Sequence, residues 1–280
     1  MNSLAGRAPG ADFSLDGRVA IITGGAGLLG VRHAEAIASA GGIPVLADVR
    51  ADEAEARAAE VAKAFGVPAM GVACDITKPR SVESLLHTVR ETYARVDVLV
   101  NNAANNPKVE QGGQDFSRFE QFPIDQWDAD VAVGLTGAFL CAKVFGSTFA
   151  AQGRGAIINI SSEYGILGPD QRLYLRDGVP AAQQPVKPVS YTVVKAALHG
   201  LTLYLATYWA AAGVRVNTLT LGGVENAQPR EFVDRASQRV PMGRMAMPHE
   251  FQGGLLYLCS DASSFVTGTN LIVDGGKSVW

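Results

Sequence analysis

A tyrosine and a lysine stand four residues apart near the start of a long helical pattern. Residues at this spacing lie one turn apart on the same face of a helix, so the Tyr191 phenol and the Lys195 ammonium are expected to be neighbours. A free phenol has a pKa of about 10 and is a poor acid or base at neutral pH. A nearby ammonium favours the phenolate, so we expect Lys195 to lower the pKa of Tyr191 and to make it an acid–base group.

Two adjacent serines come before this helix, at the end of a predicted strand. Alternation along a strand sends the side chains of Ser161 and Ser162 to opposite faces, so only one of them can face the tyrosine. We expect Ser162 to donate a hydrogen bond to a substrate oxygen, with Ser161 as the alternative. A tyrosine–lysine pair at this spacing also arises by chance, and in that case both side chains face solvent.

Glycines cluster in residues 23–30, directly after a predicted strand and at the start of a helix. Glycine lets the backbone turn tightly and lets a pyrophosphate approach the N–H groups of a helix N-terminus. Asp48 ends the next strand, where a carboxylate accepts hydrogen bonds from both ribose hydroxyls of adenosine and repels a 2′-phosphate. This arrangement predicts NAD, with NADP less favoured, although Arg50 lies close by. The alternatives are a tight turn without a ligand and an Asp48 that caps the following helix.

Short β-branched runs alternate with longer helical patterns along the chain. Such alternation selects a parallel sheet that is covered by helices on both faces. We therefore predict an α/β fold, a single doubly wound parallel sheet of about seven strands, with ligands bound beyond the carboxyl ends of the strands. The expected strands are 19–23, 45–47, 69–73, 96–100, 156–160, 214–219 and 270–273, and the expected helices are 28–38, 52–65, 82–93 (capped by Thr77), 125–151, 191–211 and 248–259.

Composition limits the kind of protein. The chain has 280 residues, is 48% hydrophobic and 18% charged, and carries a net charge of −3, which excludes disorder and argues against binding to nucleic acid or membrane. The three cysteines lie far apart in the sequence, which indicates a reducing compartment. None of the four histidines is spaced like a pair of metal ligands, so we expect no metal site. Residues 1–14 lack a secretory signal and predict a flexible extension before one domain at 15–280. We expect a cytoplasmic protein with a small-molecule substrate.

The chain resembles the short-chain dehydrogenase/reductase family from Leu15 to Gly276. The resemblance is carried by residues 23–30, Asp48, Asp75, residues 97–103, Ser162, Tyr191, Lys195 and residues 273–276. It implies a Rossmann-type fold, a nicotinamide cofactor, Tyr191 as acid–base residue, Lys195 as its activator and ribose anchor, Ser162 as polarising donor, and a homodimer or homotetramer. The residues expected to bind the cofactor are Gly24, Gly27, Leu28, Leu29, Gly30, Asp48, Asp75, Ile76, Asn102, Ala103, Tyr191, Lys195, Gly222 and Val224.

The chain departs from the family pattern at several positions. Its loop glycines fall at 24, 27 and 30, where 24, 28 and 30 is usual, and Leu221-Gly222-Gly223 stands where Pro-Gly is common. Gly134 occupies the place of an asparagine that supports the kink of the fourth helix and a proton-relay water. An insertion at 163–190 separates Ser162 from Tyr191, where about a dozen residues are usual.

The insertion predicts the substrate class, because loops of this length usually carry function. Polar side chains within it and near two strand ends favour a polyhydroxylated substrate, neutral or anionic, such as a sugar phosphate, sugar acid or nucleotide sugar. These side chains are Asp170, Gln171, Arg172, Tyr174, Arg176, Asp177, Gln183, Gln184, Lys187, Asn105, Asn106, Lys108, Glu225, Asn226, Gln228 and Arg230. The insertion and the Gly-Gly-Val-Glu-Asn-Ala-Gln-Pro run are also similar to bacterial members assigned to flagellin glycosylation and surface-sugar synthesis.

The leading interpretation is an oxidoreductase that moves a hydride between nicotinamide and a secondary alcohol or ketone of a carbohydrate-type substrate. One alternative is reduction of 3-oxoacyl thioesters on an acyl carrier protein, against which Asp48 and the polar loop count. Another is that the insertion is a solvated loop that never touches substrate. A third is a catalytically silent cofactor-binding or assembly protein, and Gly134 is the only feature that favours it.

Overall fold

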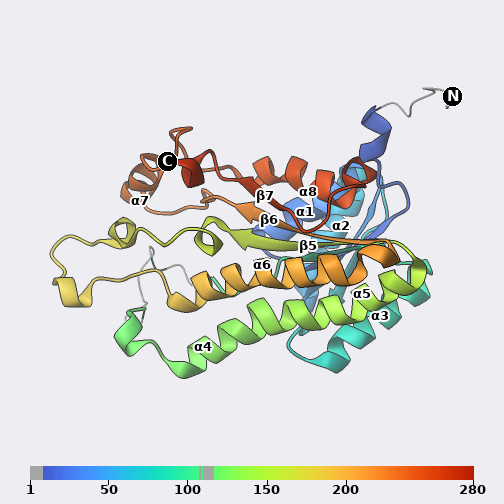
Figure 1. The fold of residues 1–280 in the computed structure, drawn as a ribbon, viewed down its shortest axis with the longest axis horizontal. Helices are drawn as coiled ribbons and strands as arrows, with labels where there is room; N and C mark the ends of the chain where they lie inside the picture. Colours follow the sequence, from blue (N-terminus) through green and yellow to red (C-terminus); the bar gives the residue numbers. More distant parts are fainter. Residues whose placement is uncertain (1–8, 107–108, 110–116) are drawn as a thin grey trace.

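Seven parallel strands form one sheet in the order β3-β2-β1-β4-β5-β6-β7 (Figure 1). This computed structural model describes residues 9–106, 109 and 117–280. The strand order reverses between β1 and β4, which is where a doubly wound sheet binds its ligand. The strands are β1 Val19–Thr23, β2 Ile43–Asp48, β3 Met70–Ala73, β4 Val98–Asn101, β5 Gly155–Ser162, β6 Val214–Leu221 and β7 Asn270–Val273. The predicted fold class and strand number are confirmed.

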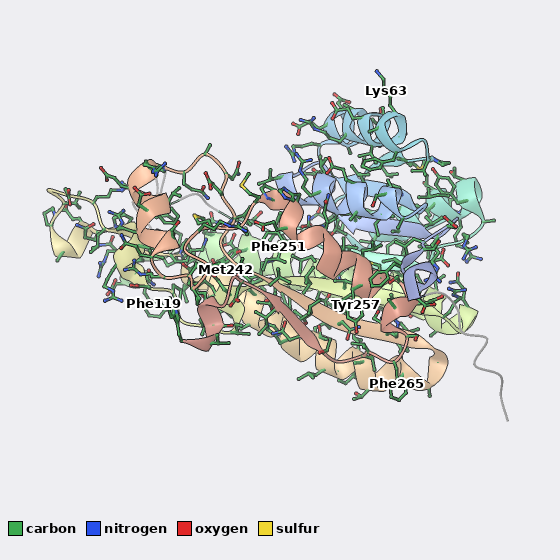
Figure 2. The ribbon with its side chains drawn as sticks, turned by 90° about the horizontal axis from the view of Figure 1, so that it is seen from above. Lys63, Phe119, Met242, Phe251, Tyr257 and Phe265 are labelled. Atoms are coloured by element: carbon green, nitrogen blue, oxygen red, sulfur yellow. The ribbon has the colours of Figure 1, made fainter. Side chains whose placement is uncertain are left out.

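Helices cover both faces of the sheet, because successive strand residues point to opposite sides. In β1, Ala20 and Ile22 pack with α1, α2 and α8, whereas Val19 and Ile21 pack with α3, α5 and α6. Both sets are fully buried, which explains why the strand reads as one apolar run. The helices are α1 Leu28–Ser39, α2 Ala51–Phe65, α3 Pro79–Tyr93, α4 Ile124–Val131, α5 Ala138–Gln152, α6 Val189–Trp209, α7 Arg230–Ser237 and α8 Gln252–Cys259. Figure 2 looks onto the α8 side, where Phe251 and Tyr257 are labelled.

The long helix predicted at 125–151 is observed, with one irregularity. A π-helical turn, Ala132–Gly137, joins α4 to α5. The whole stretch Ile124–Gln152 is long and apolar enough to cross a membrane by length and composition, with a mean hydropathy of 1.5. Its Phe145 and Phe149 are fully buried in the cluster beneath the sheet, so it packs as a core helix.

Two local features differ from expectation. Thr77 does not cap α3, which begins at Pro79 after Lys78; the Thr77 hydroxyl donates to Asp75 instead, at 2.6 Å. The eight-residue helix α7 was not predicted, because its short amphipathic pattern lies in a polar stretch.

The segment before the sheet is only partly described. Residues 1–8 of the predicted flexible extension lie outside the described residues. Residues Pro9–Phe13 form a 3₁₀ helix, and the Phe13 ring lies 6.5 Å from the Tyr257 ring of α8. This part of the extension therefore packs on the body of the protein.

A chain of buried polar side chains fixes α6 to the sheet. The Asn101 amide in β4 donates to Asn159 in β5 at 2.9 Å, and Asn159 donates to the Thr202 hydroxyl in α6 at 2.8 Å. Thr202 in turn hydrogen-bonds Thr218 in β6 at 2.7 Å. Buried polar groups are costly when unpaired, so this network sets the position of α6 along the sheet.

His33 in α1 makes the stability of the fold depend on pH. Its ring is fully buried, and burial lowers its pKa to about 4, which the nearby Asn102 side chain offsets only in part. Neither ring nitrogen has a well-formed hydrogen bond within the described residues. The unfolded chain takes up a proton at about pH 6.5, whereas the folded protein resists it, so stability is lost as the pH falls from about 6.5 toward 4.

We expect this histidine to lower the free energy of unfolding by about 2 kcal/mol between pH 7 and pH 5. The measurement is urea unfolding of the wild type and of His33→Leu at both pH values, which removes the titration and should reduce the pH-dependent loss by about that amount. His87→Gln, at an exposed position on α3, is the matched control. An equal loss of stability in the wild type and in His33→Leu would contradict this account.

Candidate active site

A cavity of about 880 Å³ opens at the carboxyl ends of the strands. Every residue predicted to be catalytic or to bind cofactor lines it: Gly24, Gly27, Leu28, Leu29, Gly30, Asp48, Asp75, Ile76, Asn102, Ala103, Ser162, Tyr191, Lys195, Gly222 and Val224. The cavity runs from the β1–α1 loop to the far ends of β5 and β6. The structure thus brings together, in one space, residues that are spread over 200 positions of the chain.

The start of α6 places the tyrosine and the lysine. Pro188 is the N-cap of α6, and its backbone is still extended, so the helix begins at Val189. One turn separates Tyr191 from Lys195, and the Lys195 ammonium lies 5.9 Å from the centre of the Tyr191 ring. The ammonium donates a hydrogen bond to the Ile160 carbonyl at 2.8 Å, which holds this buried side chain at the end of β5.

The two serines at the end of β5 take different positions, as alternation predicts. The Ser161 hydroxyl donates to the Lys195 carbonyl at 2.8 Å and lies 3.1 Å from a His199 ring nitrogen, so it ties β5 to α6. The Ser162 hydroxyl accepts from the Tyr164 N–H at 3.3 Å and faces the Tyr191 phenol, whose pKa it lowers. Of the two serines, Ser162 is thus the one that lies beside the phenol.

The pKa of Tyr191 moves in the opposite direction to that expected from Lys195. Burial is the largest influence and raises the pKa of the phenol, the Ser162 hydrogen bond lowers it, and the Glu163 charge raises it. The expectation that the lysine would bring the phenol into the working range is wrong for the polypeptide by itself. Burial was underestimated, because the sequence pattern does not reveal how deeply the ring lies.

A second lysine lies against the tyrosine. The Lys187 ammonium is 3.9 Å from the centre of the Tyr191 ring and donates to the Asn106 side-chain oxygen at 2.7 Å. Burial lowers the pKa of Lys195 to about 8, and the Lys187 charge adds to that effect. Sequence analysis named Lys187 only as one of many polar residues, since its spacing from Tyr191 matches no motif.

The β1–α1 loop has the shape of a phosphate cradle. Gly24 has a φ of +63°, and a side chain there would lie 3.0 Å from the Ala103 backbone. At Gly30, a Cβ would lie 2.3 Å from the Gly24 carbonyl oxygen. Asn102 holds the loop by donating to the Thr23 carbonyl at 2.9 Å. The loop leaves the N-terminus of α1 open to the cavity, and this fits a dinucleotide pyrophosphate.

Asp48 and Asp75 line the same half of the cavity. The Asp48 carboxylate accepts from the Ala26 N–H at 3.1 Å and from the Arg50 N–H at 3.1 Å, and Arg50, not Asp48, is the N-cap of α2. The side chain of Arg50 reaches both Asp48 and Glu53, so its charge is partly paired. Asp75 accepts from Thr77, and that hydrogen bond holds its pKa below the usual range. Asp48 and Asp75 thus bring two carboxylates to the half of the cavity that lies beside the glycine loop.

Gly134 lies in the π-helical turn and is buried. A Cβ at this position would come within 2.4 Å of the Val194 side chain of α6, so valine takes the space where a longer side chain would project. The helix therefore deviates here without an asparagine to support it, and position 134 offers no side-chain group to a proton path.

The insertion is less polar toward the cavity than expected. Of the predicted polar side chains, those that line the cavity are Lys187, Tyr174, Asn105, Asn106, Asn226 and Gln228. Those that do not line it are Asp170, Gln171, Arg172, Arg176, Asp177, Gln183, Gln184, Glu225 and Arg230. Lys108 lies outside the described residues. The reason is that several of these side chains hold the loop in shape. Asp170 binds Arg239 at 2.5 Å, just after α7, and Gln184 bonds the backbone of Arg176 at 2.8 Å.

Several lining residues were missed by the sequence analysis. Leu173 and Phe232 form an apolar wall with Val240 and Met245, contributed by the insertion, α7 and the turn after it. Glu163 and Lys277, the latter near the C-terminus, also line the cavity. The only signals were the position of Glu163 directly after Ser162 and the apolar residues within a polar loop. The segments that carry these residues gather at one end of the molecule (Figure 1).

Comparison with known proteins agrees with this geometry. Residues 18–174 match the family model described as short chain dehydrogenase, and residues 179–278 match one described as Enoyl-(Acyl carrier protein) reductase. The chain belongs to the short-chain dehydrogenase/reductase family. The resemblance stated from the motifs is thereby confirmed at the level of the family.

Among its relatives, the chain is 32% identical to the D-threitol dehydrogenase of Mycolicibacterium smegmatis, covering 96% of this chain and 95% of the relative. It is 29% identical to the NAD-dependent glycerol dehydrogenase of Listeria innocua, covering 96% of each. Its fold matches the gluconate 5-dehydrogenase of Burkholderia cenocepacia, solved with NADP and tartrate, with a TM-score of 0.84 at 28% identity, covering 97% of this chain and 99% of that one.

These findings establish a short-chain dehydrogenase/reductase that acts on alcohol groups with a nicotinamide cofactor. Relatives include both NAD-dependent and NADP-bound members, so the family alone does not select between the two.

Proposed function

We propose that the protein oxidises a secondary alcohol of an alditol or related sugar, or reduces the matching ketone, with NAD as the preferred cofactor. The observation that carries this proposal is that Tyr191, Lys195 and Ser162 line the same cavity as the glycine loop and Asp48. Proton-transfer groups and a nucleotide cradle in one space are what such a reaction requires.

The roles of the side chains follow from their positions. Ser162 donates to the substrate oxygen, and Tyr191 takes the hydroxyl proton during oxidation or returns it during reduction. Lys195, held at the Ile160 carbonyl, anchors a ribose and adds positive charge beside the phenol. When bound, oxidised nicotinamide supplies the hydride acceptor and a further positive charge, which counteracts the effect of burial on the phenol.

The remaining predicted residues would hold the nucleotide. The pyrophosphate would lie in the cradle formed by Gly24, Gly27, Leu28, Leu29 and Gly30. The Asp48 carboxylate would accept hydrogen bonds from the adenosine ribose hydroxyls, which is why we favour NAD over NADP. The other parts of the nucleotide would lie against Asp75, Ile76, Asn102, Ala103, Gly222 and Val224.

A small polyol is favoured as substrate because the cavity offers hydrogen-bonding groups near Tyr191. Lys187 and its partner Asn106 lie beside Tyr191, and Asn226 and Gln228 also line the cavity. Named relatives act on threitol and glycerol, which supports the same class. The apolar wall of Leu173, Phe232 and Met245 is the observation that favours the second candidate, a 3-oxoacyl thioester. The narrower flagellin and surface-sugar assignment rests on the insertion and on the Gly-Gly-Val-Glu-Asn-Ala-Gln-Pro run, and the relatives found do not add to it.

The experiment is a screen of NAD and NADP reduction over alditols, sugar acids, sugar phosphates and nucleotide sugars, with acetoacetyl thioester and NADPH as a separate arm. We expect the highest kcat/KM with NAD and an alditol or sugar acid. Turnover of nucleotide sugars alone would favour surface-sugar synthesis, and turnover of the thioester alone would favour the second candidate. NADH binding without turnover in any arm would contradict the proposal and favour a silent binding protein.

We keep three expectations as proposals alongside this function. One is a domain at 15–280 with its insertion at 163–190. Another is a homodimer or homotetramer. The exposed side chains of Leu203, Tyr204 and Tyr208 on α6 offer an apolar face for it, and light scattering would measure the number of subunits. The third is a cytoplasmic location, which the three free, buried cysteines support.

A further inference from the structure

A buried ion pair joins the C-terminal end of the chain to the residue after Ser162. The Lys277 ammonium pairs with the Glu163 carboxylate, and their side chains are 13% and 5% exposed. The same ammonium lies 5.0 Å from the centre of the Tyr164 ring. Both charged residues line the cavity that holds Tyr191.

The backbone holds Lys277 in this place from two directions. Asp274, which follows β7, accepts the N–H groups of Gly276 at 2.9 Å and Ser278 at 2.8 Å and so fixes the turn. Gly276, just before the lysine, has a φ of +88°, and the Met242 N–H donates to Gly275 at 3.2 Å. The side chain that meets Glu163 is thus carried by an ordered turn.

Stability alone gives no reason for this pair. A buried ion pair is often no more stabilising than two well-packed apolar side chains, because both charges must leave water. The second carboxylate oxygen of Glu163 has no hydrogen-bond donor within the described residues, so the site is not optimised as a structural bridge. An electrostatic role in the cavity is the better explanation.

The charges around Tyr191 show what that role is. Lys195 on the same helix and Lys187 before it bring positive charge to the ring. Glu163 brings negative charge and raises the pKa of the phenol. The buried Asp130 carboxylate of α4 lines a small pocket with Tyr191 and accepts from the Ser190 hydroxyl. Tyr164 also lies within electrostatic range of Tyr191. Lys277 is the cation that neutralises Glu163 directly.

We propose that Lys277 is a positioning residue. By pairing with Glu163 it neutralises the carboxylate that lines the cavity with Tyr191, so that the phenol exchanges its proton close to neutral pH. This inference rests on the proposed function, in which Tyr191 is the proton-transfer residue.

The test compares Glu163→Gln, Lys277→Met, Lys277→Arg and the Glu163→Gln/Lys277→Met double variant in the full-length protein. The readout is the pH at which kcat/KM for oxidation of the best substrate reaches half its plateau. A second readout, which needs no substrate, is the tyrosinate absorbance of each variant minus that of the same variant carrying Tyr191→Phe, titrated with NAD present.

We expect shifts of opposite sign. Glu163→Gln leaves Lys277 as an unpaired positive charge and should lower the midpoint by at least about 0.5 pH unit. Lys277→Met leaves the carboxylate unpaired and should raise the midpoint, while the double variant and Lys277→Arg should lie close to the wild type. If Lys277→Met does not fold, Glu163→Gln and the double variant still decide the question.

If the pH midpoint of kcat/KM is the same in all folded variants, whether or not their activity is lower, the proposal is overturned. The Lys277–Glu163 pair would then be only a structural ion pair. The proposed function fails in a different way: Tyr191→Phe would then keep its turnover, or the substrate screen would find none in the wild type.

Discussion

Replacing Tyr191 with phenylalanine is expected to lower kcat at least about 1,000-fold while the Kd for NADH stays within roughly threefold of the wild type. The change removes one hydroxyl and keeps the aromatic ring. We assign the substrate proton to Tyr191 because the Ser162 hydroxyl is not a base, Lys195 is held at the Ile160 carbonyl, and Glu163 is paired with Lys277. The measurement is NADH formation under saturating substrate, with NADH binding followed by fluorescence.

Tyr257→Phe is the matched control, since it makes the same change on α8 at a side chain that does not line the cavity. We expect it to keep wild-type kcat. Turnover in Tyr191→Phe comparable to that of Tyr257→Phe would remove Tyr191 from the mechanism.

Neutralising Asp48 is expected to change the cofactor preference by about 100-fold. A 2′-phosphate at the end of β2 meets the buried Asp48 carboxylate, and like charges in contact cost several kcal/mol. Asp48→Asn keeps the shape and one acceptor but loses the charge. The ratio of kcat/KM for NAD over NADP should therefore fall, chiefly because NADP improves; a 100-fold change corresponds to about 2.7 kcal/mol.

Asp48→Ser adds a second step, because it also removes the acceptor for the ribose and should raise the KM for NAD. Glu53→Gln is the control: it neutralises a carboxylate that pairs with Arg50 but does not line the cavity. A ratio that stays unchanged in Asp48→Asn, or that changes equally in Glu53→Gln, would show that Asp48 does not select the cofactor.

The nucleotide half of the cavity could be predicted from sequence because its signals are local. A glycine run after a buried strand and an acid at the next strand end are short patterns, and the parallel sheet brings such strand ends to one edge. Tyr191, Lys195 and Ser162 followed for the same reason, since helix and strand periodicity set which side chains share a face.

The substrate half could not be predicted, because it depends on contacts between distant segments. Asp170 is polar in sequence but binds Arg239 after α7, and Leu173 is buried and lines the cavity although Arg172 beside it is exposed. Lys277 is 114 residues from its partner Glu163, a pairing that no spacing rule indicates. The pKa of Tyr191 was misjudged for a related reason, since burial depends on the whole fold.

The account as a whole depends on where the nicotinamide nucleotide binds, and a crystal structure of the protein with NADH tests it most directly. We predict that the adenosine ribose hydroxyls bind the Asp48 carboxylate, that the pyrophosphate lies at the loop of Gly24 and Gly30, and that the nicotinamide ribose meets Tyr191 and Lys195. A nucleotide bound elsewhere, or bound here with Tyr191 turned away from the nicotinamide, would contradict it.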